Sequence, residues 1–468
     1  MSASMRPIRH PRLSLLALAA CLLGGCAVSP TYHRPGTPEP AAFKEADGWV
    51  PAAPADALER GPWWTLFGDP LLDALVAQVE VSNQNVAASV AAYAQARALV
   101  QEQRAGLFPS VDLTAGATRS GGGPNGTNKQ MRLSLGGSWE PDIWGRLRAG
   151  VTGANASAQA SAADLAGARL SAQGELASDY FSLRQTDAQR ALLVVTIDGY
   201  QRVLQITQNR FDAGIAAKSD VLQAQTQLAN ARVDELSLAR QRAQFEHAIA
   251  VLIGKAPADF SLPVATWAAS VPVVPLGVPS TLLQRRPDIA AAERRVAAAN
   301  EQIGIARSAY YPNIGLSASY GTGGSRVGDL FKASNALWSF GLSAAENLFN
   351  GGATRARVAG AQAAHDQAVA RYRQSVLDAF ADVENQLSAT HVLGEQQDLR
   401  RQASEAADQV EAQTLNRYKA GQVSYAEVVQ SQQTALTARR AVIQTQADRQ
   451  TTAVALIQSL GGGWHAGQ

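Results

Sequence analysis

Few residues in this chain have types that could bind a metal or act as nucleophiles. Its 468 residues hold only two cysteines, three methionines and six histidines. No two histidines have helical ligand spacing with a carboxylate or cysteine beside them, as a metal or catalytic site would need. We therefore expect no metal, no cofactor and no enzyme activity. The histidines are His10, His33, His247, His365, His391 and His465.

One cysteine has the setting for a covalent modification. Residues 1–25 join a basic start to an apolar run, Leu13–Leu23, that is too short to span a bilayer, which predicts a signal peptide. Leu23-Gly24-Gly25-Cys26 resembles the bacterial lipobox, in which the cysteine thiol is acylated and the leader is cut before it. We expect Cys26 to be the acylated first residue of the mature chain, and Ala27, where an aspartate would favour the inner membrane, points to the outer membrane. An ordinary signal peptide with an incidental cysteine is the alternative.

The charge balance gives no reason to expect nucleic-acid binding. The formal charge of +2 includes three leader arginines, so the mature chain has 38 basic and 39 acidic residues. The glycine-rich stretch 121–126 lacks a following Lys-Ser/Thr pair and lies between two predicted strands, which makes it a loop and not a nucleotide site.

The chain repeats one pattern at an offset of 207 residues. Asn209-Arg210-Phe211-Asp212-Ala213-Gly214, which leads into Asp220, recurs as Asn416-Arg417-Tyr418-Lys419-Ala420-Gly421, which leads into Glu427. A unit of this length is a whole supersecondary assembly and not a solenoid repeat. We expect Gly214 and Gly421 each to end a helix in the left-handed conformation, so that each motif marks the tip of a helical hairpin.

Four segments alternate between apolar and polar residues, which predicts two β-hairpins, at 110–140 and 313–345. Their lengths suit tilted membrane strands of roughly 9 to 11 residues. A soluble sandwich with one wet face would show the same alternation. Open edges in lipid would leave backbone groups unpaired, so membrane strands would have to be pooled between subunits. Three chains would give a wider barrel than two, and only the wider barrel leaves an aqueous bore.

Two proline-free stretches of 64 residues, Leu147–Arg210 and Thr354–Arg417, predict helices of roughly 95 Å. Each returns from its tip over about 37 residues, to Gly254 and Gly461. Apolar residues recur every seven along the returns, which predicts left-handed supercoiling. Pro70–Leu107 and Thr281–Ala309 would supply the remaining half-length helices.

These patterns divide the chain into six segments. They are a signal peptide (1–25), an extended tether that separates lipid from fold (26–62), a first repeat with its tip near 211–218 (63–255), a proline-rich linker (256–280), a second repeat with its tip near 418–424 (281–461) and a tail (462–468).

The run Leu283-Gln-Arg-Arg-Pro-Asp-Ile-Ala-Ala-Ala-Glu293, followed by Ala298-Ala299-Asn300, Ile303-Gly304 and Tyr311-Pro312, closely resembles the signature of TolC-like outer-membrane factors. With Cys26, Trp63-Trp64 and both tip motifs, the resemblance covers essentially the whole mature chain. It is greatest to the lipoprotein branch that serves tripartite efflux pumps of the resistance-nodulation-division class.

The resemblance implies an α+β membrane fold. Three chains would share a twelve-stranded outer-membrane β-barrel, continued through the periplasm by an α-helical barrel of coiled-coil hairpins. The protein would be a passive exit duct for small molecules such as drugs, working with a periplasmic adaptor and an inner-membrane transporter. A surface lipoprotein with a coiled-coil stalk and no pore would explain Cys26 and the heptads, but not the amphipathic strands.

The resemblance also implies a gate at the periplasmic end, formed by the hairpin tips. Carried over by position, Glu427 falls on the first acidic position of a ring, and Gln430 on a second that is often aspartate. Asp220 falls on a position that accepts a hydrogen bond from the second-repeat tip aromatic, here Tyr418. Val423 stands where some members have an arginine, so a salt-bridge lock is not implied at that position.

Overall fold

The computed structural model describes residues 28–37, 40, 42–45, 62–122, 127–265, 267, 270–272, 274 and 286–462. The chain forms two compact units: one comprises 1–36, 92–162 and 291–374, and the other 37–91, 163–290 and 375–468. Each unit combines segments from both repeats. Cys26, the predicted signal peptide and the signature residues 283–285 lie outside the described residues.

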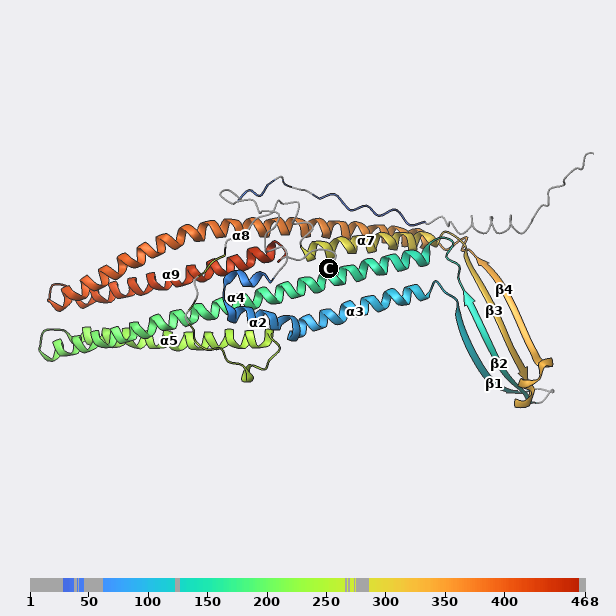
Figure 1. The fold of residues 1–468 in the computed structure, drawn as a ribbon, viewed down its shortest axis with the longest axis horizontal. Helices are drawn as coiled ribbons and strands as arrows, with labels where there is room; N and C mark the ends of the chain where they lie inside the picture. The colour runs from blue at the N-terminus through green and yellow to red at the C-terminus, as the bar shows by residue number, and fades with distance from the viewer. Residues whose placement is uncertain are drawn as a thin grey trace, which may run out of the picture. The chain divides into compact units, whose positions relative to one another are not determined.

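The first unit contains one four-stranded antiparallel sheet in the order β1-β2-β3-β4 (Figure 1). The two predicted hairpins are present, and they join through β2 and β3. Because β1 and β4 are the outer strands, each has a single partner among the described strands. The strands are β1 Ser110–Gly121, β2 Thr127–Trp139, β3 Asn313–Gly324 and β4 Ala336–Ala345.

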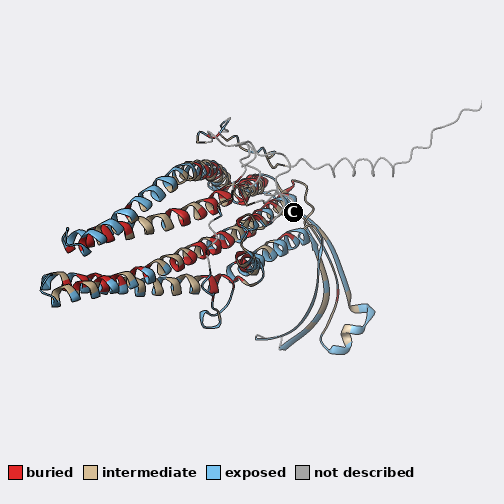
Figure 2. Ribbon diagram, turned by 60° about the vertical axis from the view of Figure 1, so that its left-hand side comes forward, coloured by how far each residue is buried: buried red, intermediate tan, exposed pale blue. Residues whose placement is uncertain are grey.

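The strand register sorts the side chains onto two different faces. One row across all four strands consists of Leu113, Leu135, Tyr320 and Trp338, which are 71%, 50%, 60% and 79% exposed. The opposite face carries hydroxyls, with cross-strand Oγ–Oγ contacts of 2.7 Å for Thr114–Ser134 and 2.8 Å for Ser319–Ser339. Figure 2 shows the strands as mostly exposed. An apolar face of this size in a single chain calls for a non-aqueous covering.

The long helices of the two repeats match in length. α4 (Arg146–Asp212) and α8 (Ala353–Lys419) each have 67 residues, and the returning α5 (Lys218–Leu252) and α9 (Tyr425–Ser459) each have 35. Within the part of the chain that the structure describes, no helix is both long and apolar enough to cross a bilayer.

The first half-length segment is broken where the sequence predicted one continuous stretch. It forms α2 (Pro70–Ser82) and α3 (Gln84–Ala105) on either side of Asn83. The Asn83 side-chain oxygen accepts the N–H groups of Asn85 and Val86 at 2.9 and 3.1 Å, which caps α3, and its amide donates to the Leu252 carbonyl at 2.8 Å. The corresponding helix of the second repeat is α7 (Pro287–Ser308).

Aromatic residues fix the start of the first repeat within the second unit. The short 3₁₀ helix η2 (Trp63–Phe67) buries Trp63 and Phe67, and the Phe67 ring lies 4.9 Å from that of Phe181. Asp69 then caps α2 by accepting the N–H groups of Leu71 and Leu72 at 3.0 and 3.3 Å. The other 3₁₀ helices are η3 (Pro257–Asp259), η4 (Val327–Phe331) and η5 (Ala333–Asn335).

Residues 28–36 of the predicted tether are bound along the helices of the first unit. The Val28 N–H donates to the Trp144 carbonyl at 3.3 Å, and the Asn300 amide donates to the Pro30 carbonyl at 2.9 Å. Tyr32 donates to Glu293, and Arg34 Nε donates to the Tyr372 hydroxyl at 3.0 Å. This part of the predicted tether is therefore hydrogen-bonded to the helices of the first unit.

Candidate functional site at the hairpin tips

The two helical hairpins of the second unit end in matching turns. Past α4 the N–H of Ile215 donates to the Arg210 carbonyl at 2.8 Å, and past α8 the N–H of Gln422 donates to the Arg417 carbonyl at 2.9 Å. Gly214 and Gly421 have φ of 73° and 74°. This six-to-one bond with a left-handed glycine is the Schellman ending, which satisfies carbonyls that the helix itself leaves free.

Arg210 extends from the first tip to the second. Its Nη1 donates to the carbonyls of Tyr418 and Lys419 at 3.0 and 3.1 Å. Its Cζ lies 4.8 Å from the centroid of the Tyr418 ring. The carbonyls at a helix C-terminus carry partial negative charge, so the guanidinium stabilises the end of α8. It also makes a cation–π contact with the Tyr418 ring. Its Nε is buried and has no hydrogen-bond partner among the described residues.

The equivalent arginine of the second repeat is placed differently. Arg417 is exposed and lies in the last turn of α8. Phe211 of the first tip is half-buried, with the Lys218 ammonium 5.2 Å from its ring centroid. The two repeats are therefore alike in backbone, and only the first sends its arginine to the other tip.

Tyr418 is buried, with 3% of its surface exposed. Its hydroxyl donates to Thr207 Oγ1 at 3.4 Å, a long bond, and its ring centroid lies 5.5 Å from that of Tyr425. Within the single chain the hydroxyl is therefore directed toward α4, and the expected bond to Asp220 stays a prediction. Both tyrosines pack in one apolar cluster with Val203, Ala224 and Val428.

Asp220 lies in the first turn of α5 and is half-buried. The Ser219 hydroxyl lies 3.5 Å from its Oδ1. The pKa of the Tyr425 hydroxyl is raised, first by burial, then by Tyr418 and Tyr200, and also by the negative charge of Asp220. Asp220 is therefore electrostatically coupled to the tyrosine cluster, although it does not accept a bond from Tyr418 within the described chain.

Glu427 and Gln430 are both exposed in the single chain. Glu427 Oε1 accepts the backbone N–H and the hydroxyl of Ser424, each at 3.3 Å, so Glu427 is part of the capping box of α9. Gln430 Nε2 lies 3.5 Å from Thr434 Oγ1. The capping role of Glu427 was missed in the sequence, where Ser424-x-x-Glu427 was the available signal.

A buried pair of glutamine side chains joins α5 and α9, the returning helices of the two hairpins. Gln227 Nε2 of α5 donates to Gln432 Oε1 of α9 at 3.1 Å, with the residues 8% and 3% exposed. Neither residue was predicted from the sequence. The available signal for Gln432 was a polar side chain four residues after the apolar Val428, on the same side of the helix. A polar residue in such a seam fixes helix register at some cost in stability.

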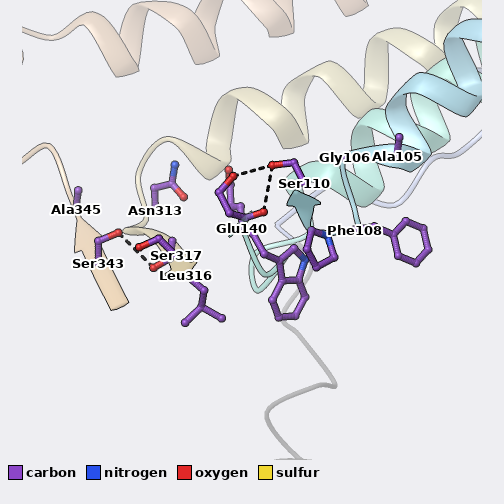
Figure 3. A pocket seen from close by; sticks show the side chains of 14 residues that line it. Ala105, Gly106, Phe108, Ser110, Glu140, Asn313, Leu316, Ser317, Ser343 and Ala345 are labelled. Carbon is purple, nitrogen blue, oxygen red and sulfur yellow. Dashed lines mark hydrogen bonds between the residues drawn. The ribbon is translucent and has the colours of Figure 1, made fainter. Parts of the chain in front are cut away.

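A cavity of about 720 Å³ in the first unit offers no comparable chemistry (Figure 3). It lies where the strands meet the helical segments, and its lining includes Ser110 and Ser138, whose hydroxyls are 2.8 Å apart. Glu140, the single carboxylate among its lining residues as the structure describes them, is paired with Arg146 at 2.7 Å. Among the described residues no group of three or more metal-binding side chains occurs.

Comparison with known proteins finds relatives that match this chain over both repeats. The family model described as outer membrane efflux protein matches residues 75–255 and 278–462. The chain is 31% identical to the antibiotic efflux pump outer membrane protein ArpC of Pseudomonas putida, covering 96% of this chain and 95% of the relative. It is 30% identical to the pyoverdine export outer membrane protein OpmQ of Pseudomonas aeruginosa, covering 97% of each.

Solved structures of outer-membrane channels superpose on nearly the whole chain. The outer-membrane channel OprN superposes with a TM-score of 0.84 at 31% identity, covering 94% of this chain and all of that one. The open-state MtrE outer membrane channel of Neisseria gonorrhoeae superposes with a TM-score of 0.81 at 26% identity, covering 94% and 98%.

Proposed function

The chain belongs to the outer membrane efflux protein family, and we propose that three copies of it form one continuous exit duct. As a family member it is a non-enzymatic efflux channel of the outer membrane that extends into the periplasm. Its TolC-like character, expected from the sequence, is confirmed by the family match and by the solved channels.

The sheet is the observation that carries the trimer proposal. It has two outer strands, β1 and β4, and one face of exposed apolar side chains. In lipid, unpaired strand edges cost several kcal/mol per backbone group, so β1 of one chain would pair with β4 of the next. Three chains then close a twelve-stranded barrel, with the apolar face toward lipid and the hydroxyl face toward an aqueous bore.

The matched hairpins supply the periplasmic part of the duct. Two outgoing helices of 67 residues and two returns of 35 per chain would assemble with those of the other copies into an α-helical barrel. The heptad spacing on the returns supports such paired packing. The tips described above would lie at its entrance.

The tips form the proposed gate. Three copies of Glu427 around a narrow entrance would concentrate negative charge and favour cations. Tyr418, Asp220 and Gln430 would set the contacts between neighbouring tips. Within one chain, Arg210 holds the first tip to the second, so opening would move the two tips of a chain together.

An acylated Cys26 would add a lipid anchor beside the barrel. A periplasmic adaptor and an inner-membrane transporter would deliver the cargo, which we propose to be small molecules such as drugs. Relatives named for antibiotic efflux and for pyoverdine export support a small-molecule cargo.

Single-channel recording of the purified full-length protein tests this proposal. A trimer by native mass spectrometry with stepwise ion conductance in planar bilayers is the expected result. A folded monomer that never conducts would support the alternative of a coiled-coil surface lipoprotein without a pore. The exposed apolar strand face already weighs against that alternative, because a coiled-coil stalk in water would not expose a sheet face of apolar side chains.

A further inference from the structure

Basic residues gather at one end of the sheet. Residues 113–139 contain Arg119, Lys129 and Arg132 and no acidic residue. Residues 314–345 contain Arg326, Lys332 and a single acid, Asp329. Arg119 lies near the end of β1 and Lys129 near the start of β2, whereas Arg326 and Lys332 lie between β3 and β4, and Arg132 is the sixth residue of β2. The connections between these strands lie at the end of the sheet that is remote from the helices (Figure 1).

Two of these cations face each other directly. Arg119 on β1 is the register partner of Lys129 on β2. Both continue the apolar face, because they follow the alternation that places Leu113 and Leu135 opposite each other. Arg326 lies two residues past Gly324, the β3 partner of Met131, in the connection between β3 and β4. We call Arg119, Lys129 and Arg326 the cationic row.

The row is short of negative charge. Asp329 accepts from Lys332 Nζ at 2.8 Å and from the backbone N–H of Arg326 at 3.2 Å. Arg119 and Lys129 are exposed and have no carboxylate partner among the described residues. Like charges placed directly opposite in an antiparallel pair destabilise it. An anion held between them would remove that penalty.

The position of Lys129 along β2 sets the depth of the cationic row in the membrane. Ten residues of β2 separate Trp139, at the start of the apolar face, from Lys129. With a rise of about 3.4 Å per residue and a strand tilt of about 40°, they span roughly 26 Å along the membrane normal. An outer-membrane barrel carries an apolar band about 25 Å tall. The cationic row therefore falls at the level of lipid headgroups.

We propose that the cationic row binds the phosphate groups of lipopolysaccharide in the outer leaflet. This rests on the proposed barrel, with its apolar face toward lipid. The helices extend into the periplasm, so the opposite end of the sheet meets the outer leaflet, whose glycolipid carries phosphates. Arginine matches phosphate with a fork of N–H donors and lysine with a point charge, and both side chains can reach along an apolar surface to a headgroup.

Native mass spectrometry of the delipidated full-length trimer tests the proposal. Lipopolysaccharide is titrated onto the wild type, Arg119→Gln, and the double variant Arg119→Gln/Lys129→Gln. We expect the double variant to bind at least tenfold more weakly, the single variant to fall between, and dephosphorylated lipopolysaccharide to bind the wild type as weakly as the double variant binds the intact lipid. Arg132→Gln is the matched control, because Arg132 pairs in register with Gly116 and Gly323 on the hydroxyl face; its binding should match the wild type.

Three results would overturn the assignment: wild-type affinity in the double variant, equal affinity for dephosphorylated lipid, or equal affinity for phosphatidylglycerol. Inorganic phosphate at the same concentration should not compete. The same spectra report whether each variant is trimeric, and bilayer recordings report its conductance. A trimeric, conducting double variant with unchanged lipid binding would therefore refute the lipid site alone, whereas a protein that neither trimerises nor conducts would refute the duct.

Discussion

The guanidinium of Arg210 lies over the ring of Tyr418 at 4.8 Å and donates to the carbonyl of the same residue at 3.0 Å. One side chain of the first repeat thus holds both the backbone and the ring of the second-repeat tip. Because Tyr418 also packs on Tyr425, this contact links the end of α8 to the beginning of α9.

Replacing Arg210 should loosen the closed tips. Arg210→Gln removes a cation–π contact worth about 0.5–2 kcal/mol and the charge from two hydrogen bonds. We expect higher conductance of the closed channel in planar bilayers, with Arg210→Lys intermediate. Arg417→Gln is the control, since Arg417 occupies the same motif position but is exposed. If both glutamine variants raised conductance equally, the link between the tips would not be the cause.

Tyr418→Phe tests the bond to Thr207. A neutral hydrogen bond contributes about 1 kcal/mol, so we expect a modest rise in closed-state conductance. Asp220→Ala should also raise it, if Asp220 accepts a bond from a neighbouring chain in the trimer. A double-mutant cycle of Tyr418→Phe with Thr207→Val, measured by thermal unfolding, separates the two partners. Additive effects would show that the hydroxyl contact with Thr207 contributes nothing.

The free energy of unfolding should decrease as the pH rises, because Asp179 on α4 then loses its proton. Burial, with a smaller contribution from Glu175, raises the pKa of Asp179 from 3.8 to about 6. The folded protein thus keeps a proton that the unfolded chain releases, and the stabilisation is complete below about pH 4 and lost as the pH rises through 6. Asp179→Asn should raise the melting temperature at about pH 7.5 and leave it nearly unchanged at about pH 4. Asp198→Asn, at an exposed position of the same helix, is the matched control.

Much of the architecture could be predicted because local sequence determines it. The proline-free stretches gave the positions of α4 and α8, and the alternation gave all four strands, since both patterns act through the chain's own periodicity. The break at Asn83 could not be predicted in this way, because no proline or glycine marks it. The Asn83 amide also donates to the Leu252 carbonyl, 169 residues away in the chain, and no local pattern indicates that contact.

The site shows the same limit. The left-handed glycines at the tips could be predicted from the repeat. The Asn-Arg-aromatic motif that both repeats share does not indicate that Arg210 contacts the other tip while Arg417 stays exposed. The partner of Tyr418 is likewise set by packing between α4 and α8. The Glu427 capping box, in contrast, is a local motif and was available in the sequence.

Acylation of Cys26 is predicted from the lipobox and is directly measurable. Mass spectrometry of the purified protein should show a mature chain that begins at Cys26 and carries acyl groups. Cys26→Ser should reduce assembly more than it reduces membrane residence, because the barrel would also anchor the protein. An unmodified cysteine, or cleavage at another position, would refute the anchor.

Glu427 is predicted to make the entrance of the channel cation-selective. Glu427→Ala should lower cation selectivity and the block by multivalent cations in planar bilayers. It would also remove the acceptor of the Ser424 N–H, and losing such a cap costs about 0.5–2 kcal/mol. Glu427→Gln is the sharper variant, because its amide oxygen can still accept that bond while the charge is gone.

The two variants separate charge from capping. If charge sets selectivity, Glu427→Gln and Glu427→Ala should lose selectivity to a similar degree, while only the alanine variant should also lose thermal stability. Gln430→Ala should change selectivity less, since the side chain it removes is uncharged. An intact trimer of Glu427→Gln with wild-type selectivity would show that Glu427 serves α9 as a helix cap and contributes nothing to an acidic ring.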